Sequence, residues 1–493
     1  MFRRIIAIIL AVCTIGGITV GAQGYYYNRK GKSVVCPDAY VAGGIIDGVT
    51  LGVGTFNDVK DLYVADDGTL YIADTGNNRI VIVNSDNTLN KVITEVNYKG
   101  AARELAAPEG VFFHDGELYV CDTGNQEILI LDKDNNVVRV CGRPDSASLP
   151  ENTTYKPSKV VVNSAGSIFV QANGIYQGLV QYGPECNFIN FFGATPIEVT
   201  TEVVINNIWK SIFSDEAREG MERTISSELN NIYIDSEDFV FTVTASVTEG
   251  QVRRLNAAGS NILRFPGYDD VTIFTSGYNF NIFGDQEQDY TKGAAVTSNI
   301  VDVHIDDEDI IAVLDKQRGK IFLYDIEMNP LAIFGGKGDQ VGYFTSAVAL
   351  EKRGDSYLIS DEEKNTITIM EPTSYIEQIR ESLKIYKEGL YEESVEGWEK
   401  ILELNPSFTI AYRSIGRAYL QQGETVKALE YLREGDDRYY YSLAMQNFRR
   451  DFIRNNWQWA VPTFAVLIAA VWAVIHYYKK WLKKPSKKDR RKA

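Results

Sequence analysis

The chain has 493 residues, 45% of them hydrophobic, and a formal charge of −16 at pH 7. Its length argues against a single domain. The segment from Lys479 onward holds nine Lys and Arg and one Asp, so removing its net charge of +8 leaves −24 on the residues before it. A body this acidic would repel the phosphates of nucleic acid, and we therefore exclude nucleic acid as a partner.

The N-terminus has the order of a secretory signal. Arg3 and Arg4 precede an apolar run from Ile5 to Val20, and small residues follow up to Ala22. These are the n-region, the h-region and the cleavage site of a signal peptide. We predict a signal peptide over 1–22 with an uncleaved N-terminal anchor as the alternative, and in either case the following residues emerge outside the cytoplasm.

Residues 39–373 contain degenerate repeats of four short strands. The sequence LYIADTGNNRIVIV begins at Leu70 and recurs as LYVCDTGNQEILIL from Leu118. A period of about 40–50 residues is typical of propeller blades. We predict six units, of which the fourth ends in a strand over 262–265. The sixth has three strands and takes its fourth from 39–46, which closes the ring and removes an exposed edge.

The two clearest copies resemble the NHL-repeat family of six-bladed β-propellers. The resemblance is carried by Asp74-Thr75-Gly76-Asn77-Asn78-Arg79 and Asp122-Thr123-Gly124-Asn125, and more loosely by Asp315-x-x-Arg318-Gly319 and Asp361-x-x-Lys364-Asn365. It implies a mainly β fold with a central channel and loop-rich faces, in a family that binds proteins, RNA or small ligands. Related propellers include sugar lactonases. We assign the motif aspartates a structural role, because Asp accepts backbone hydrogen bonds in turns.

Two insertions interrupt the repeats, at 194–226 and at 267–296. Insertions of this size lie on a face of a propeller rather than in the ring. The second is rich in aromatic residues, which could stack on a glycan or a partner protein, or could instead pack a local hairpin onto the blades. The candidate ligand- or partner-binding residues are Tyr268, Tyr278, Phe280, Phe283 and Tyr290.

Four cysteines follow the predicted signal peptide. Cys121 and Cys141 fall on the second and fourth strands of one unit, too far apart for a disulfide, so we interpret them as small buried hydrophobic residues. Nothing in the sequence tells whether Cys36 and Cys186 meet. An exported protein without evident disulfide pairing suggests a Gram-positive bacterium.

From residue 374 the apolar pattern changes to the helical period of 3.6. Two units over 374–437 share an offset of 34 residues, which matches Ser382 to Gly416 and Gly389 to Gly423. This pattern resembles the tetratricopeptide repeat. The resemblance implies a small α-helical domain whose groove holds a peptide or a partner helix. The alternative is a rigid spacer.

The segment 457–478 contains no Asp, Glu, Lys or Arg. At ~1.5 Å per residue it spans about 30 Å, the thickness of the hydrocarbon core of a bilayer, and Trp and Tyr lie at its ends. We predict a transmembrane helix there, with a juxtamembrane helix over 438–456 before it. The basic tail over 479–493 is then cytoplasmic, and the rest of the chain lies outside.

Motifs for catalysis are missing from the sequence. The three histidines, His114, His304 and His476, are not at metal-ligand spacing, and there is no HExxH, CxxC, GxSxG or P-loop motif. We therefore name no catalytic or cofactor-binding residue. A channel Ca²⁺ ion stays open, because the related lactonases use such a metal.

These observations favour a membrane-anchored extracytoplasmic binding or scaffold protein. Its propeller and helical repeats would present a surface to a partner protein or a glycan, as in accessory proteins of bacterial membrane transport systems. Two alternatives remain, namely a lactonase-like metal-dependent hydrolase and a purely structural assembly factor.

Overall fold

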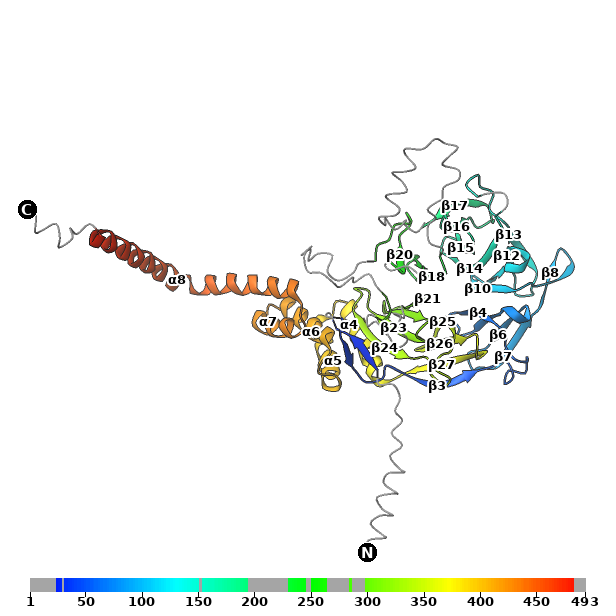
Figure 1. The fold of residues 1–493 in the computed structure, drawn as a ribbon, viewed down its shortest axis with the longest axis horizontal. Coiled ribbons are helices and arrows are strands. Elements are labelled where there is room, and N and C mark those ends of the chain that lie inside the picture. The colour runs from blue at the N-terminus through cyan, green and yellow to red at the C-terminus, as the bar shows by residue number, and fades with distance from the viewer. Residues whose placement is uncertain are drawn as a thin grey trace, which may run out of the picture. The chain divides into compact units, whose positions relative to one another are not determined.

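The computed structural model describes residues 24–28, 31–149, 153–193, 229–244, 250–263, 283–285 and 298–482. It divides into two compact units, 1–384 and 385–493, which we treat separately (Figure 1). The predicted signal peptide and the insertion at 194–226 lie outside the described residues. The insertion at 267–296 is described only at 283–285.

The first unit is a ring of six antiparallel blades, as predicted (Figure 1). Blade 1 is formed by β4 (Val59–Val64), β5 (Leu70–Asp74), β6 (Arg79–Val83) and β7 (Leu89–Ile93). Blade 2 is formed by β10 (Pro108–His114), β11 (Glu117–Asp122), β12 (Glu127–Leu131) and β13 (Val137–Cys141). Blade 3 is formed by β14 (Lys156–Val162), β15 (Ile168–Asn173), β16 (Leu179–Tyr182) and β17 (Phe188–Phe192). Blade 4 is formed by β18 (Asn231–Ile234), β19 (Val240–Val243) and β20 (Val252–Leu255). Blade 5 is formed by β21 (Ile300–Ile305), β22 (Ile311–Asp315), β23 (Lys320–Tyr324) and β24 (Pro330–Gly335). Blade 6 is formed by β25 (Ala347–Arg353), β26 (Ser356–Asp361) and β27 (Thr366–Pro372).

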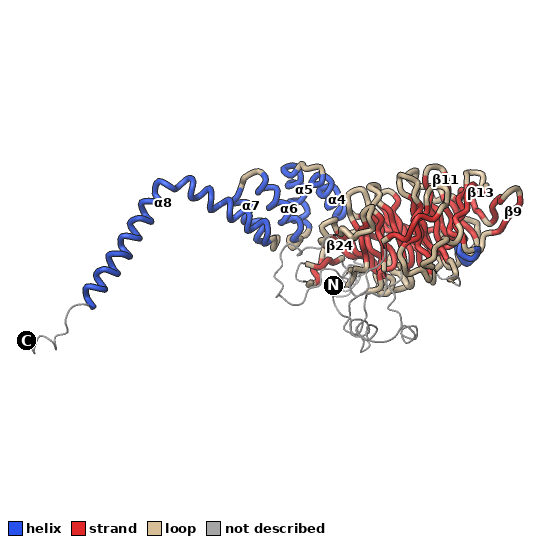
Figure 2. The backbone as a smooth tube through the Cα atoms, turned by 90° about the horizontal axis from the view of Figure 1, so that it is seen from above, coloured by secondary structure: helices blue, strands red, loops and turns tan. Residues whose placement is uncertain are grey.

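The ring closes at blade 6 through a strand from the start of the chain. β3 (Tyr40–Ile46) pairs antiparallel with β27, from Ile367↔Ile46 to Pro372↔Tyr40. This confirms the predicted closure by 39–46. The first strand of each blade packs beside the first strand of the next, so β4, β10, β14, β18, β21 and β25 surround the axis. In Figure 2 the strands form one layer with loops on both sides.

Four strands were not predicted. β1 (Tyr25–Tyr27) and β2 (Ser33–Val35) extend blade 5 at its outer edge, and β8 (Glu95–Tyr98) and β9 (Ala101–Glu104) form a hairpin between blades 1 and 2. The predicted strand over 262–265 is not formed by its described residues. Near it, blade 4 has only an isolated bridge, between Leu255 and Asn261.

The motif aspartates are structural, as the turn chemistry predicts. Asp74 is fully buried, accepts the Asn57 amide at 2.8 Å and pairs with Arg79 Nε at 2.6 Å. Asn78 ends the turn with φ of 53°, in the left-handed region that Asn tolerates. A Cβ at Gly76 would lie 2.9 Å from the backbone oxygen of Asn57, so this position favours glycine. The motif therefore fixes the turn between the second and third strands.

One interpretation of the cysteines is wrong. Cys141 forms a disulfide with Cys186, and so joins the last strand of blade 2 to a turn of blade 3. The spacing within one unit excludes only a bond between Cys121 and Cys141, whereas the observed bond links neighbouring units. Cys36 and Cys121 are free and buried. The disulfide also removes the observation on which the Gram-positive suggestion rested.

Helix α4 (Ser374–Lys387) begins directly after blade 6. Its Arg380 is buried and pairs with Asp355 and Glu308, which lie in the first turns of blades 6 and 5. Tyr375 and Ile379 are buried on the same helix. The start of α4 is therefore held on the propeller by apolar burial and by a buried ion-pair network.

The second unit is helical. It contains α5 (Tyr391–Leu404), α6 (Thr409–Gln421), α7 (Thr425–Glu434) and α8 (Arg438–Leu482). A Cβ at Gly416 would lie 2.6 Å from Leu432, which explains the small residue at this helix crossing. The helices confirm the change of period after residue 374, whereas their identity as tetratricopeptide repeats stays a prediction.

Helix α8 merges two segments that were predicted separately. It runs without a break through 438–456 and the predicted span, with Pro462 inside it. The part Val461–Trp481 is long and apolar enough to cross a membrane, and none of it is buried. No other helix in the described residues has this length and composition.

Candidate functional site

The six inner strands begin on one side of the ring, which we call the entry face, and end on the exit face. On five of these strands the register skips one residue close to the entry face, as between Val59 and Asp61. Such a bulge bends the strand and redirects the extra side chain, and bulges are frequent beside functional sites. The five extra residues are Lys60, Glu109, Ser158, Val301 and Val348.

A second repeated position follows the buried aspartate at the end of the second strand. In blade 1 it is Thr75, whose Oγ1 donates to Pro108 O of blade 2 at 2.7 Å. In blade 2 it is Thr123, whose Oγ1 donates to Pro157 O of blade 3 at 2.6 Å. Each threonine therefore ties its blade to the next through one neutral, buried hydrogen bond.

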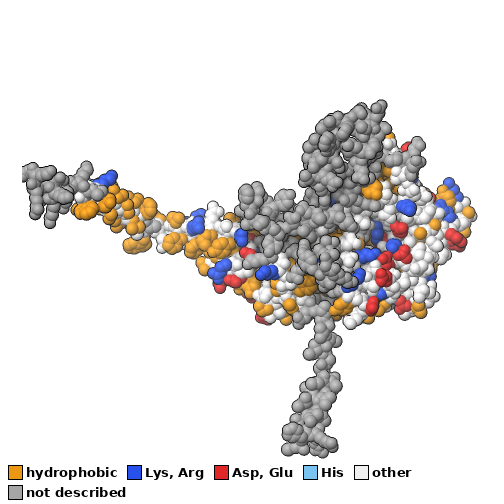
Figure 3. All heavy atoms as spheres, in the orientation of Figure 1, with side chains coloured by type: hydrophobic (Ala, Val, Ile, Leu, Met, Phe, Trp, Pro, Cys, Tyr) orange, Lys and Arg blue, Asp and Glu red, His pale blue; other side chains and the backbone are white. Residues whose placement is uncertain are grey.

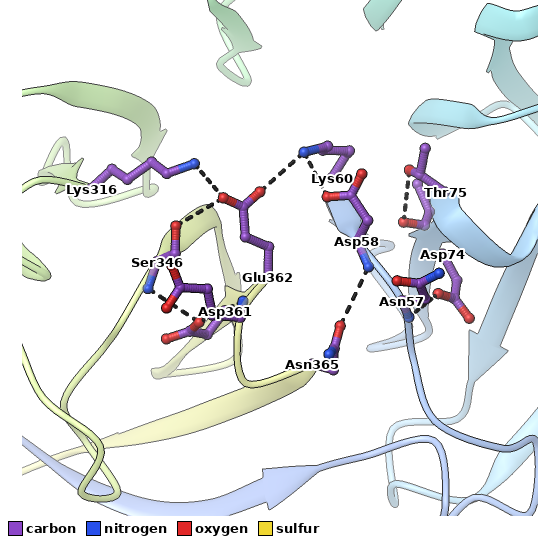
Figure 4. A network of polar contacts seen from close by, with 12 residues as sticks. Asn57, Asp58, Lys60, Asp74, Thr75, Lys316, Ser346, Asp361, Glu362 and Asn365 are labelled. Carbon is purple, nitrogen blue, oxygen red and sulfur yellow. Dashed lines mark hydrogen bonds and ion pairs between the residues drawn. The ribbon is translucent and has the colours of Figure 1, made fainter.

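Blades 5 and 6 carry charged residues at the same position. Lys316 Nζ lies 2.6 Å from Glu362 Oε1, and Lys60 Nζ of blade 1 lies 3.0 Å from Glu362 Oε2. Lys60 also pairs with Asp58 at 2.7 Å, and Ser346 Oγ donates to Glu362 at 2.8 Å. Figure 4 shows Glu362 between the two lysines. Three blades thus meet through a chain of ion pairs.

The charged groups are only partly shielded from water. The side chains of Lys60, Lys316 and Glu362 are 35%, 31% and 20% exposed. Burial raises the pKa of Glu362, but the hydrogen bonds from Lys316, Lys60 and Ser346 outweigh it and lower the pKa to about 2. Glu362 is therefore ionised at neutral pH, while both ammonium groups stay within reach of solvent.

Glu109 differs from the other charged groups. It is half-buried at a bulge, and its carboxylate has no hydrogen bond or ion pair within the described part of the chain. Burial raises its pKa, against the opposing effect of Lys60 and Lys159. Glu109 thus offers a free acceptor at the entry face. We call the following residues the entry cluster: Asp58, Lys60, Glu109, Lys316 and Glu362.

Below the entry cluster, the axis holds a buried charged layer. Lys159 of blade 3 pairs with Asp61 of blade 1, past Gly110 of blade 2. A Cβ at Gly110 would lie 2.5 Å from Ser158 O, so only glycine leaves this space. Asp61 accepts the Val111 amide at 2.9 Å, which ties blade 1 to blade 2.

Asp302 repeats this arrangement in blade 5. Its Oδ2 accepts the Leu350 amide of blade 6 at 2.7 Å, and Asn231 of blade 4 donates to its Oδ1 at 2.5 Å. Burial raises the pKa of Asp302 to about 7, although Lys159 and the Leu350 amide oppose the rise. The contacts of the middle layer, Asp61, Lys159, Asn231 and Asp302, thus reach all six blades and tie blades 1 to 3 and blades 4 to 6 together.

A third layer lies toward the exit face, two residues further along the inner strands. His304 Nδ1 lies 3.1 Å from Glu351 Oε1, and its ring packs against Tyr233 at 4.8 Å. Tyr63 and Phe112 pack at 4.7 Å. His304 thus lies beside a buried carboxylate, and among the described residues no group of three or more His, Cys, Asp or Glu could hold a metal ion. The suggested Ca²⁺ ion has no ligand set there.

The predicted aromatic site cannot be assembled from the described residues. Tyr268, Tyr278, Phe280 and Tyr290 lie outside them. Phe283 is 1% exposed and packs edge-on against Tyr324 at 5.5 Å, which is the local packing alternative rather than a free stacking surface.

Sequence reasoning did not identify the entry cluster. The sequence does contain a signal for this cluster. The first two copies of the repeat have Thr after the motif aspartate, whereas the later copies have a charged residue there, in Asp315-Lys316 and Asp361-Glu362.

Comparisons with known proteins gave one family match and similarities to solved structures. Residues 56–83 match the family model of the NHL repeat. Virginiamycin B lyase from Staphylococcus aureus is similar at 11% identity over 65% of this chain and 97% of that chain, with a TM-score of 0.41. The Swd1 β-propeller domain of Myceliophteria thermophila is similar at 7% identity over 68% and 100%, with a TM-score of 0.38. A search of curated proteins gave no match. Similarities this low carry no argument about activity.

Proposed function

We propose that the protein is a membrane-anchored extracytoplasmic binding or scaffold protein. The observation that carries the proposal is the apolar half of α8, where no part of Val461–Trp481 is buried. Exposed apolar side chains on this scale mark a membrane or a partner. Their length matches a bilayer, and Trp457 and Tyr478 lie near the two ends of the span.

Binding fits the channel better than catalysis. In the middle layer, Lys159 pairs with Asp61, and Asp61 and Asp302 each accept a backbone amide of a neighbouring blade. Groups held in this way stabilise the ring, and they are not free to transfer protons to a substrate. The entry cluster is the part of the axis that keeps exposed donors and an unpaired acceptor. The partner would be a protein or a glycan.

The helical unit supports the scaffold part of the proposal. Its buried interface includes Trp398 and Leu432, both with no exposed surface. If these helices are tetratricopeptide repeats, they offer a second surface for a partner helix or peptide. A propeller and a helical unit on one anchor would raise the effective concentration of a second contact. This arrangement suits an accessory protein of a bacterial membrane transport system.

The test is the topology of the full chain in a bacterial membrane. We expect external protease to digest the propeller and to leave a tag after Ala493 intact. The control exchanges Leu467 and Val471 for Lys, at about 3 kcal/mol of insertion free energy each. The tail should then cross the membrane and lose its tag, whether or not residues 1–22 are cleaved. A tag cut equally in both chains contradicts the proposal.

A further inference from the structure

The entry cluster departs from the rest of the repeat in a way that packing does not require. Thr75 and Thr123 tie neighbouring blades with one neutral hydrogen bond each. At the same position Lys316 and Glu362 use charged groups that must be partly desolvated. Ion pairs this exposed contribute little stability. Since the simpler contact is available to this fold, the charged version has another role.

We infer that the entry cluster binds a neutral polyhydroxylated ligand, that is, a sugar. The inference rests on the proposed function and chooses between its two partner classes. A hydroxyl group carries one donor and two acceptor lone pairs. Lys60 and Lys316 supply donors, and Glu109 supplies an acceptor with no partner in the described residues. Neighbouring hydroxyls of one sugar can use both kinds of group.

The charge balance argues against an ionic ligand. The entry cluster has two ammonium groups and three carboxylates, and Asp61, Lys159 and Asp302 lie below it. An anion would meet this excess of carboxylates. A cation would meet the two lysines, which lie on either side of Glu362 (Figure 4). On the propeller face shown in Figure 3, basic and acidic side chains are likewise interspersed.

An apolar contribution comes from two further bulges. Val301 and Val348 occupy in blades 5 and 6 the position that Lys60 occupies in blade 1. Both are partly exposed, although they lie on inner strands. Small-molecule sites combine apolar surface with a few placed polar groups. Sugar rings present both a C–H face and hydroxyl edges, and so fit this combination.

The experiment is calorimetric titration of the full chain, purified in a polyoxyethylene detergent that has no sugar headgroup. The probes are glucose, galactose, xylose, N-acetylglucosamine, cellobiose and maltose, with phosphate and butylamine as charged comparators. We expect at least one sugar to bind. Glu109→Gln and Lys316→Met should each weaken it tenfold or more, as losing a hydrogen bond to a charged group does.

The matched control is Lys91→Met. Lys91 lies on β7, the outermost strand of blade 1, and its Nζ donates to Asn135 Oδ1 of blade 2, away from the entry cluster. It should leave sugar affinity unchanged. Glu109→Gln is nearly isosteric and removes no internal contact, so its melting temperature should match that of the parent.

Three results would overturn the inference: no probe sugar binds at about 10 mM, binding is unaffected by the Glu109 and Lys316 variants, or phosphate or butylamine binds in place of a sugar. Each leaves the membrane topology untouched. If the chain has the expected topology but binds no sugar, only this inference is contradicted. If the tag is cut, the anchored function is contradicted and the titration result is unaffected.

Discussion

Blades 1 and 2 and blades 5 and 6 use the same backbone for different chemistry. In all four, a buried aspartate ends the second strand, namely Asp74, Asp122, Asp315 and Asp361. In the first pair the next residue is a threonine that bonds to the neighbouring blade, and in the second pair it is Lys316 or Glu362. Positions where the backbone of a repeat is conserved between blades but the side chain changes are therefore the best indicators of a functional site.

The first prediction concerns the buried aspartate that these four blades share. We expect Asp74→Ala to lower the free energy of unfolding by about 3 kcal/mol, because it leaves the Asn57 amide without its acceptor and removes the ion pair of Arg79 with a fully buried carboxylate. Denaturant unfolding of the full chain measures this. Asp86→Ala, in an exposed turn of the same blade, is the control and should cost far less stability. Equal losses would mean that the motif aspartate has no special role.

The second test separates the buried layer from the entry cluster by pH. Asp302 has a folded pKa of about 7 against 3.8 for an ordinary Asp, so between these values the folded chain keeps a proton that the unfolded chain has lost. Stability should therefore fall as pH rises from about 4 to about 7, by up to about 1.4 kcal/mol per unit. Above pH 7 the contribution is constant.

Asp302→Asn should remove this slope, which is measured as the difference in unfolding free energy between variant and parent across the pH range. Glu362→Gln is the contrast. Because the folded pKa of Glu362 is about 2, the parent loses the stability that this carboxylate contributes as pH falls below about 4. The variant should therefore lack this loss below about pH 4 and keep the slope between pH 4 and 7. If Asp302→Asn leaves the slope between pH 4 and 7 unchanged, another group controls it.

The ring was predictable because its signals are local. The spacing of Leu70 and Leu118 gave the repeat, and the strand at the start of the chain closed blade 6 as expected. The continuous helix α8 was missed in part, since composition separates 438–456 from the apolar span although one backbone carries both.

The entry cluster and the disulfide were not predictable in the same way. Lys60 and Glu362 are far apart in sequence and meet only because blade 6 lies beside blade 1. Cys141 and Cys186 likewise come from neighbouring blades. In a ring of repeats, contacts between units depend on the register of each blade. That register follows from the bulges, which the sequence does not mark.

The last test, which has the smallest expected effect on stability, gives blades 5 and 6 the threonine that blades 1 and 2 have after the motif aspartate. In the double variant Lys316→Thr and Glu362→Thr, each hydroxyl can donate to the first residue of the next inner strand, as Thr75 does to Pro108 O. One neutral hydrogen bond is worth about 1 kcal/mol, and we expect ion pairs that stay partly open to solvent to contribute a similar amount after screening. The free energy of unfolding should thus stay within about 1 kcal/mol of the parent, while sugar binding is lost. A large loss of stability would show that the charged chain holds the ring together, and its departure from the repeat would then need no ligand.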